Sequence, residues 1–117
     1  MSKAVIFLGW TRPMPGREQK GVQYFQEFLG YLTGLQESGD IDSFEVVILE
    51  PHGGDLNGFC LLRGDSEKIS AVQRSDEYIA HITRSSLLLE GLGSIRGITG
   101  ERVTEWMGLF GDVISKL

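Results

Sequence analysis

The sequence predicts an α+β protein whose elements follow the order β-α-β-β-α-β, with one further helix at the C-terminus. Short apolar runs rich in β-branched residues alternate with segments whose apolar residues recur at helical spacing. Glycine and proline turn signals separate the two kinds of segment. A length of 117 residues favours one domain, 1–117, in which the C-terminal helix occupies about 100–116.

The first predicted strand is the apolar run 3–10, which is too short to cross a membrane as a helix. Successive side chains of a strand point to opposite faces of the sheet. One face receives Val5 and Phe7, and the other receives an equally apolar set: Ala4, Ile6, Leu8 and Trp10. A strand with one face in water would carry polar residues at every second position. This strand does not, so we expect both faces of the sheet to be covered.

The first helix is predicted from about 17 to 38, because apolar residues recur there every three or four positions and Gly39 can end the helix. Two stripes run along it, one beginning at Val22 and an aromatic one containing Tyr24 and Phe28. We expect the first stripe to rest on the sheet. The aromatic stripe should then contact another helix, a partner subunit or a ligand.

Strand signals return at about 41–50 and 56–63, which predicts a hairpin. An interrupted helix follows, with a short first part to about Gln73 and a second part from about Asp76 to Ser85. A looser run, 87–98, predicts a fourth strand near a sheet edge. The last helix, which Thr99 could cap, carries one apolar stripe: Val103, Trp106, Met107, Phe110, Ile114 and Leu117.

Right-handed crossovers in this order place both internal helices on one face of a four-stranded antiparallel sheet, with the first and third strands central. This is the ferredoxin-like arrangement, and it leaves the other face of the sheet bare. The candidates to cover the bare face are the C-terminal helix, a second copy of the chain, or both. We therefore expect a homodimer formed through the sheet faces.

Composition narrows the classes of partner and compartment. The formal net charge is −5, and no basic run relieves it, so we expect no nucleic-acid binding. We also expect no membrane association, since no apolar segment is long enough. The single cysteine, Cys60, cannot form an internal disulfide, and we see no signal peptide. Both observations favour the cytoplasm.

The broken helix around 74–78 and the long helix ending at 35–41 resemble the dimeric α+β barrel superfamily over roughly residues 3–98. That superfamily includes YCII-related proteins, antibiotic-biosynthesis-type monooxygenases and stress-responsive barrel proteins. The resemblance implies ferredoxin-like protomers whose sheets pack face to face in a homodimer. The His-Asp pair of some YCII-related proteins has no counterpart here, so no catalytic residue is carried over.

Two candidate catalytic residues lie in the second part of the broken helix. His81 follows Glu77 by four positions, and Asp76 stands beside them. The simpler interpretation is a solvated pair on the helix face with Asp76 as a cap. The alternative is an acid or base at the mouth of a pocket.

Aromatic residues from several elements are candidates to line a cleft between the sheet and its helices. Trp10, Tyr24 and Tyr78 are the predicted ligand-binding residues, with Arg12 at the rim to hold an anion. Plain core packing explains the same residues. No histidine or cysteine spacing fits a metal site, and we expect no cofactor.

Two functional hypotheses follow from the sequence. The first is a homodimeric module that binds a small apolar or aromatic ligand. The second is a cofactor-independent enzyme, either monooxygenase-like or YCII-like, that acts on a small aromatic substrate. They differ in whether His81, Asp76, Trp10 and Tyr24 converge on one enclosed cavity.

Overall fold

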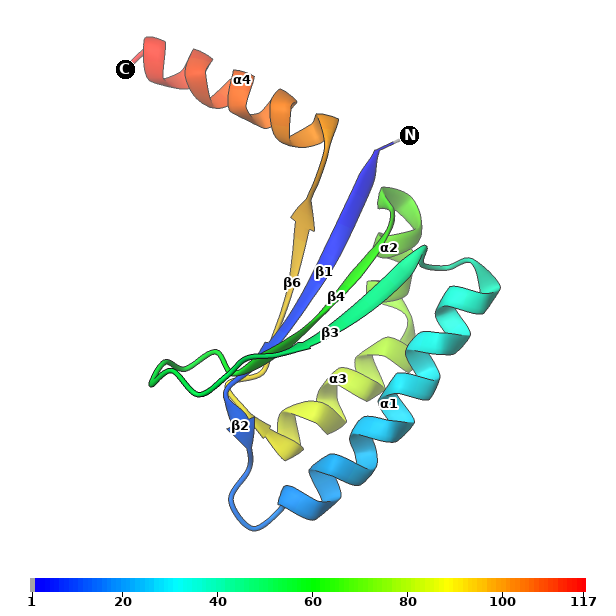
Figure 1. Cartoon of the computed structure of the whole chain (residues 1–117). Coiled ribbons are helices and arrows are strands. Elements are labelled where there is room, and N and C mark those ends of the chain that lie inside the picture. Colours follow the sequence, from blue (N-terminus) through cyan, green and yellow to red (C-terminus); the bar gives the residue numbers. More distant parts are fainter. Residues whose placement is uncertain (1) are drawn as a thin grey trace.

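The computed structural model describes residues 2–117. Four strands form one sheet in the order β3-β4-β1-β6, and every neighbouring pair is antiparallel (Figure 1). These strands are β1 (Lys3–Trp10), β3 (Ser43–Ile48), β4 (Gly58–Asp65) and β6 (Gly93–Ile98). The first and third strands of the predicted order, β1 and β4, are central, so the ferredoxin-like prediction is confirmed.

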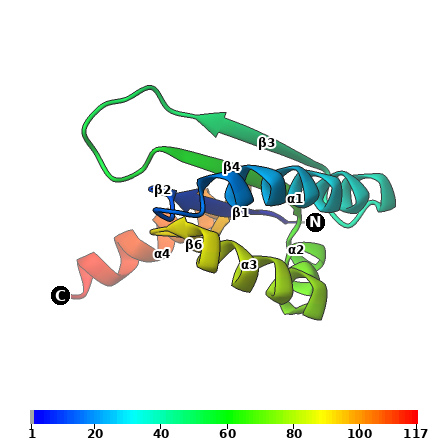
Figure 2. The same ribbon diagram turned by 90° about the horizontal axis from the view of Figure 1, so that it is seen from below.

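Three helices lie on one face of this sheet (Figures 1 and 2). They are α1 (Glu18–Ser38), α2 (Ser66–Arg74) and α3 (Asp76–Leu88). Two very short strands, β2 (Arg12–Pro13) and β5 (Leu89–Glu90), pair beside them, and α4 (Glu101–Ser115) follows β6. None of the helices in the described part of the chain is long and apolar enough to cross a membrane.

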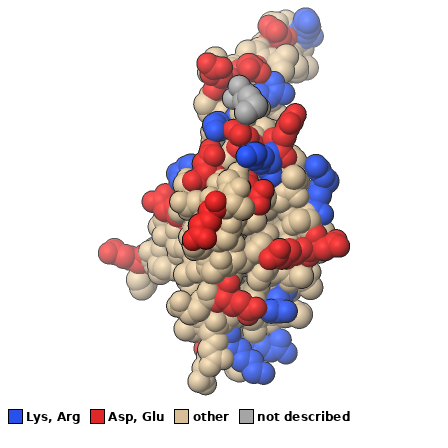
Figure 3. Space-filling model, turned by 90° about the vertical axis from the view of Figure 1, so that its right-hand side faces the viewer, with Lys and Arg blue, Asp and Glu red and all other residues tan. Residues whose placement is uncertain are grey.

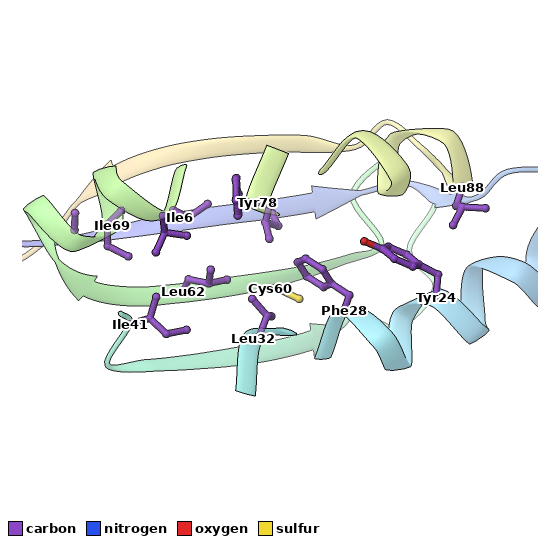
Figure 4. Packing of buried hydrophobic residues seen from close by; sticks show 13 residues of the cluster. Ile6, Tyr24, Phe28, Leu32, Ile41, Cys60, Leu62, Ile69, Tyr78 and Leu88 are labelled. Carbon is purple, nitrogen blue, oxygen red and sulfur yellow. The ribbon is translucent and has the colours of Figure 1, made fainter. Parts of the chain in front are cut away.

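The core lies between the sheet and the three helices (Figure 4). Ile6 and Leu8 of β1 and Leu62 of β4 are at most 1% exposed, and Cys60 is fully buried among them. Burial raises the pKa of the Cys60 thiol to about 12, which keeps it protonated and unreactive. The helices contribute mainly Leu32 and Ile69 to the same cluster.

The packing face of α1 differs from our expectation. Tyr24 and Phe28 of the aromatic stripe are in the core, whereas the first stripe is divided, since its start, Val22, is 61% exposed and its end, Leu32, is fully buried. The reason is that α1 packs against α3 as well as against the sheet, and the wide aromatic side chains fill the wedge between the two helices. The cap at Gly39 is as predicted, with φ of 82°.

Of three other boundaries, one agrees with the sequence prediction and two correct it. The break between α2 and α3 is confirmed, and its extended residue is Ser75. However, α3 continues to Leu88 instead of ending at Ser85, so the predicted strand 87–98 begins with the last turn of a helix. Thr99 does not cap the last helix, because Gly100 occupies that position with φ of 64°.

The second face of the sheet is left open by this chain. Its apolar side chains are half-buried or exposed and include a stacked pair, Phe7 and Phe59, with ring centroids 5.0 Å apart. Helix α4 does not cover this face, since every residue of α4 is exposed. The C-terminal helix is therefore not the cover within one protomer.

Candidate functional site

An apolar cavity lies between β1, α1 and α3, at the end of the sheet where β1 finishes. Its volume is about 180 Å³. For comparison, an apolar cavity of roughly 150 Å³ holds a benzene molecule. Three lining residues carry polar side-chain atoms, Trp10, Tyr24 and Ser85, and nearly all the others are apolar. The lining comprises Leu8, Trp10, Pro13, Gly21, Val22, Tyr24, Phe25, Phe28, Ile48, Ile82, Ser85, Leu88, Leu89 and Leu92.

A glycine in the neighbouring strand makes room for the Trp10 ring. Trp10 and Gly58 are direct partners in the antiparallel register of β1 and β4. A Cβ atom at position 58 would lie 2.6 Å from Cζ2 of Trp10, a distance that side chains do not adopt. Only glycine therefore allows the indole to lie across β4, where its edge meets Phe25 of α1 at 6.2 Å between centroids.

Tyr24 forms the polar side of the cavity wall. Its hydroxyl lies within hydrogen-bond distance of Nδ1 of His81 and, at 3.2 Å, of the His81 carbonyl oxygen, and its single proton is donated to one of these two acceptors at a time. The guanidinium of Arg84 lies over the Tyr24 ring, 5.3 Å from its centroid. Burial raises the pKa of Tyr24, so the hydroxyl is neutral and acts as a hydrogen-bond donor near neutral pH.

His81 sits behind Tyr24 in a cage of aromatic rings from α1. Its imidazole stacks on the Tyr31 ring with centroids 4.2 Å apart. It also makes an edge-to-face contact with the Phe28 ring, with centroids 5.7 Å apart. Loss of water around the ring lowers the pKa of His81. The predicted pairing of His81 with Glu77 is absent from the ion pairs of residues 2–117, because the imidazole turns toward α1.

The remaining sequence candidates lie away from the cavity. Asp76 is exposed at the first position of α3, where the cap is Ser75 and not Asp76. Tyr78 is buried, and its hydroxyl is hydrogen-bonded to Ser94 at 2.7 Å. Arg12 is exposed, and its Nε lies 3.1 Å from a carboxylate oxygen of Glu90. The four residues His81, Asp76, Trp10 and Tyr24 thus do not converge on one cavity.

Ser85 is a polar residue of the cavity that the sequence reasoning did not single out. Its side chain is buried, and its Oγ donates to the His81 carbonyl oxygen at 2.8 Å. The prediction missed it because α3 was expected to end at this position. The apolar residues that follow it, Leu87 to Leu89, were the signal that the helix continues.

The comparisons with known proteins agree on the fold. No protein-family model and no curated protein matches the sequence. A solved structure from Bacteroides fragilis, described as a dimeric protein of unknown function with a ferredoxin-like fold, has a TM-score of 0.62 at 11% identity. The match covers 85% of this chain and 98% of that one.

Two further solved structures are similar to this chain. A dimeric ferredoxin-like protein of unknown function from Thermobifida fusca has a TM-score of 0.63 at 11% identity, covering 85% of this chain and 93% of that one. SnoaB from Streptomyces nogalater, described as a cofactor-independent oxygenase, has a TM-score of 0.59 at 9% identity, covering 86% and 93%. These matches confirm the predicted ferredoxin-like fold.

Proposed function

We propose that this chain forms a homodimer through its open sheet face and binds a small apolar or aromatic molecule in the cavity beside Trp10 and Tyr24. The observation that carries the ligand proposal is the cavity itself, which is concave, largely apolar and partly enclosed by the elements of one protomer. Pockets with this character are the usual sites for small molecules.

The dimer proposal is supported by the open face of the sheet. Phe7, Phe59, Leu61 and Ile95 lie on that face, and Ile95 is 60% exposed. Covering several hundred Å² of apolar surface contributes on the order of 10 kcal/mol at ~25 cal/mol per Å². Two similar solved structures are described as dimeric, which adds to the argument.

The size and lining of the cavity favour a ligand with one aromatic ring and one polar substituent. A volume of about 180 Å³ exceeds the roughly 150 Å³ that accommodates benzene by little more than a substituent. Tyr24 and Ser85 are both in the lining, and a hydroxyl oxygen that donates its proton to His81 can still accept a hydrogen bond from such a substituent. An extended or highly charged molecule does not fit such a lining.

The surface charge argues against nucleic acid as a partner. Carboxylates and cations are interspersed on the side shown in Figure 3, and that face shows no continuous basic tract. The net charge of −5 repels a phosphate backbone.

Because Cys60 is buried and unpaired, we also expect the protein to work in the reducing cytoplasm.

The ligand proposal is tested by following the indole N–H signal of Trp10 by NMR during titration with toluene and with phenol. The Trp106→Phe background leaves Trp10 as the one indole. The expected result is a saturable shift that weakens at least ~10-fold in Val22→Phe, because Val22 lies exposed at the cavity. Gln26→Phe, on the same helix outside the cavity lining, should leave the titration unchanged. An indole signal that neither compound moves would contradict ligand binding.

An enzyme is the second candidate, and the hydrogen bond between Tyr24 and His81 favours it. A neutral imidazole behind a cavity-lining hydroxyl can accept a proton from a bound phenol through Tyr24. One similar structure is a cofactor-independent oxygenase. If the protein is such an enzyme, Tyr24 contacts the substrate, and His81 acts through Tyr24 as a positioning residue. The YCII-like resemblance stays a prediction.

The enzyme candidate is tested with hydroquinone and dioxygen, by measuring quinone formation above the rate without protein. Oxidation of hydroquinone supplies two electrons and two protons, which reduce dioxygen to hydrogen peroxide. Activity that is lost in Tyr24→Phe and His81→Gln, while phenol still shifts the Trp10 signal, would support an enzyme. Equal rates with and without the protein would leave the binding module as the function.

A further inference from the structure

Helix α4 stands apart from the rest of the protomer. It starts directly after the edge strand β6 and extends on the side of the sheet away from α1 and α3 (Figures 1 and 2). It makes no extended contact with any other helix or strand within residues 2–117. A helix of this length in isolation is only marginally stable in water, so packing must come from elsewhere.

One side of α4 is apolar along its whole length. Eight large apolar residues on or beside this stripe are 41–97% exposed, and the opposite side carries Glu101, Thr104, Glu105 and Asp112. The eight are Val103, Trp106, Met107, Leu109, Phe110, Val113, Ile114 and Leu117. Their exposed surface is on the order of 900 Å², whereas the largest apolar patch of a typical monomer is roughly 300–600 Å².

We propose that α4 is an exchanged arm, packing its apolar stripe onto a second copy of the chain beside the open sheet face. The inference rests on the proposed homodimer and adds to it the element that holds the two copies together. The arm lies on the same side of the protomer as the open face (Figure 1), and both carry exposed apolar residues, Ile95 on the sheet and Phe110 on α4 among them.

The area involved fits a second copy. Each partner of a stable complex buries ~800 Å², and the exposed surface of the α4 stripe is of that size without any contribution from the sheet. Two-fold symmetry presents the same stripe from both protomers, so one interface buries it twice. The sheet face and the arm together are large enough for a permanent dimer.

The charges of α4 argue against a membrane surface as its partner. Three acidic residues, Glu101, Glu105 and Asp112, outnumber two basic ones, Arg102 and Lys116. Helices that lie on membranes are rich in Lys and Arg on the polar side, because the lipid surface is anionic. The acidic polar side of α4 is repelled by such a surface.

Phe110→Glu tests the arm, since Phe110 lies at the centre of the apolar stripe and is 60% exposed. Thr104→Glu introduces the same charge on the polar side and is the matched control. Sedimentation equilibrium should show a dimer dissociation constant raised at least ~30-fold in Phe110→Glu and unchanged in Thr104→Glu. A wild-type dimer whose affinity neither variant changes would overturn the arm and leave the dimer standing.

A photo-crosslinking residue at position 110 distinguishes exchange from folding back onto the same protomer. Illumination should yield covalent dimers on a denaturing gel from position 110 and far fewer from position 104. Crosslinks confined to single chains, in a protein that sediments as a dimer, would place α4 on its own sheet and overturn exchange. A wild-type protein that is monomeric at every concentration would overturn the proposed dimer itself.

Discussion

The two faces of the central sheet are built from the same four strands, yet they differ in what covers them. On the helix side, Ile6, Cys60 and Leu62 are completely buried. On the open side, Phe7 and Leu61 are only half-buried. Both faces are apolar, so hydrophobicity alone does not distinguish them. The comparison teaches that strands with apolar residues on both sides can have one face covered by their own helices and the other left open to solvent within the protomer.

The handedness of the crossover connections decides which face receives the helices. Strand β1 leads into α1, and β4 leads into α2, and because such crossovers are right-handed as a rule, both return to the same side of the sheet. Side chains at even positions of β1 and β4 therefore meet α1, α2 and α3. Those at odd positions are available to a second chain.

Leu62→Ala should have the largest effect on the free energy of unfolding, because Leu62 lies in the covered face and is fully buried. We expect a loss of about 2–5 kcal/mol in urea denaturation. Leu61→Ala is the matched control from the same strand and the opposite face. In dilute, dissociated protein it should cost roughly 1 kcal/mol or less, because the side chain is already in partial contact with water. Equal losses of unfolding free energy at the two positions would contradict the difference between the two faces.

Phe7→Glu should act on association instead of on folding. Phe7 stacks on Phe59 in the open face, where a carboxylate stays hydrated in a lone protomer but is buried in the dimer. We expect the dimer dissociation constant to rise roughly 30-fold or more, measured by light scattering over a dilution series. Gln19→Glu, on the exposed side of α1, should leave it unchanged. An unaltered constant in Phe7→Glu would remove this face from the interface.

Ser75→Ala should have an intermediate effect on the helices that cover the sheet. The Ser75 Oγ accepts a hydrogen bond from the Tyr78 N–H and donates one to the Val72 carbonyl oxygen, so it joins the end of α2 to the start of α3. Loss of such a cap costs ~1 kcal/mol, which thermal unfolding can resolve. Ser86→Ala, an exposed helix position, should change stability by less than ~0.5 kcal/mol.

The pH dependence from His81 should be the smallest effect. Its pKa in the folded protein lies below the ordinary value of 6.5, because the aromatic cage removes water from the ring, while Arg84 lowers it further and Glu27 and Glu77 oppose the shift. The unfolded chain therefore binds the proton more readily than the folded one. The stability contribution is complete above pH 6.5 and is lost as the pH falls through that value.

Unfolding free energies between pH 7.5 and 5.5 test this contribution. His81→Gln should flatten the profile over that range. A wild-type slope that survives His81→Gln would place the titrating group elsewhere in the protein.

Local patterns in the sequence were sufficient for most of the fold. The element order, the break at Ser75 and the cap at Gly39 depend on residues close together in the chain, and the central positions of β1 and β4 follow from that order through the crossover rule. These features follow from propensity and turn chemistry. The predictions of the strand ends and of the last turn of α3 were less accurate, because helix and strand patterns overlap in the apolar run after Ser85.

The site depended on contacts between distant segments. Local spacing pairs His81 with Glu77, but the structure places the imidazole against Tyr24, 57 positions away. Which stripe of α1 is buried likewise depends on how α1 packs against α3, and periodicity cannot give that orientation. Trp10 and Tyr24 were found because large aromatic residues at strand ends and helix faces are frequent pocket walls. Ser85 was missed because the predicted helix ended at that position.

The most direct test of the central claim, that a second copy covers the open sheet face, is the mass of the wild-type protein by sedimentation equilibrium from nanomolar to high micromolar concentration. We expect a single reversible transition from monomer to dimer, complete by the low micromolar range. A folded protein that remains monomeric throughout that range, with Phe7 and Phe59 in contact with water, would contradict the claim.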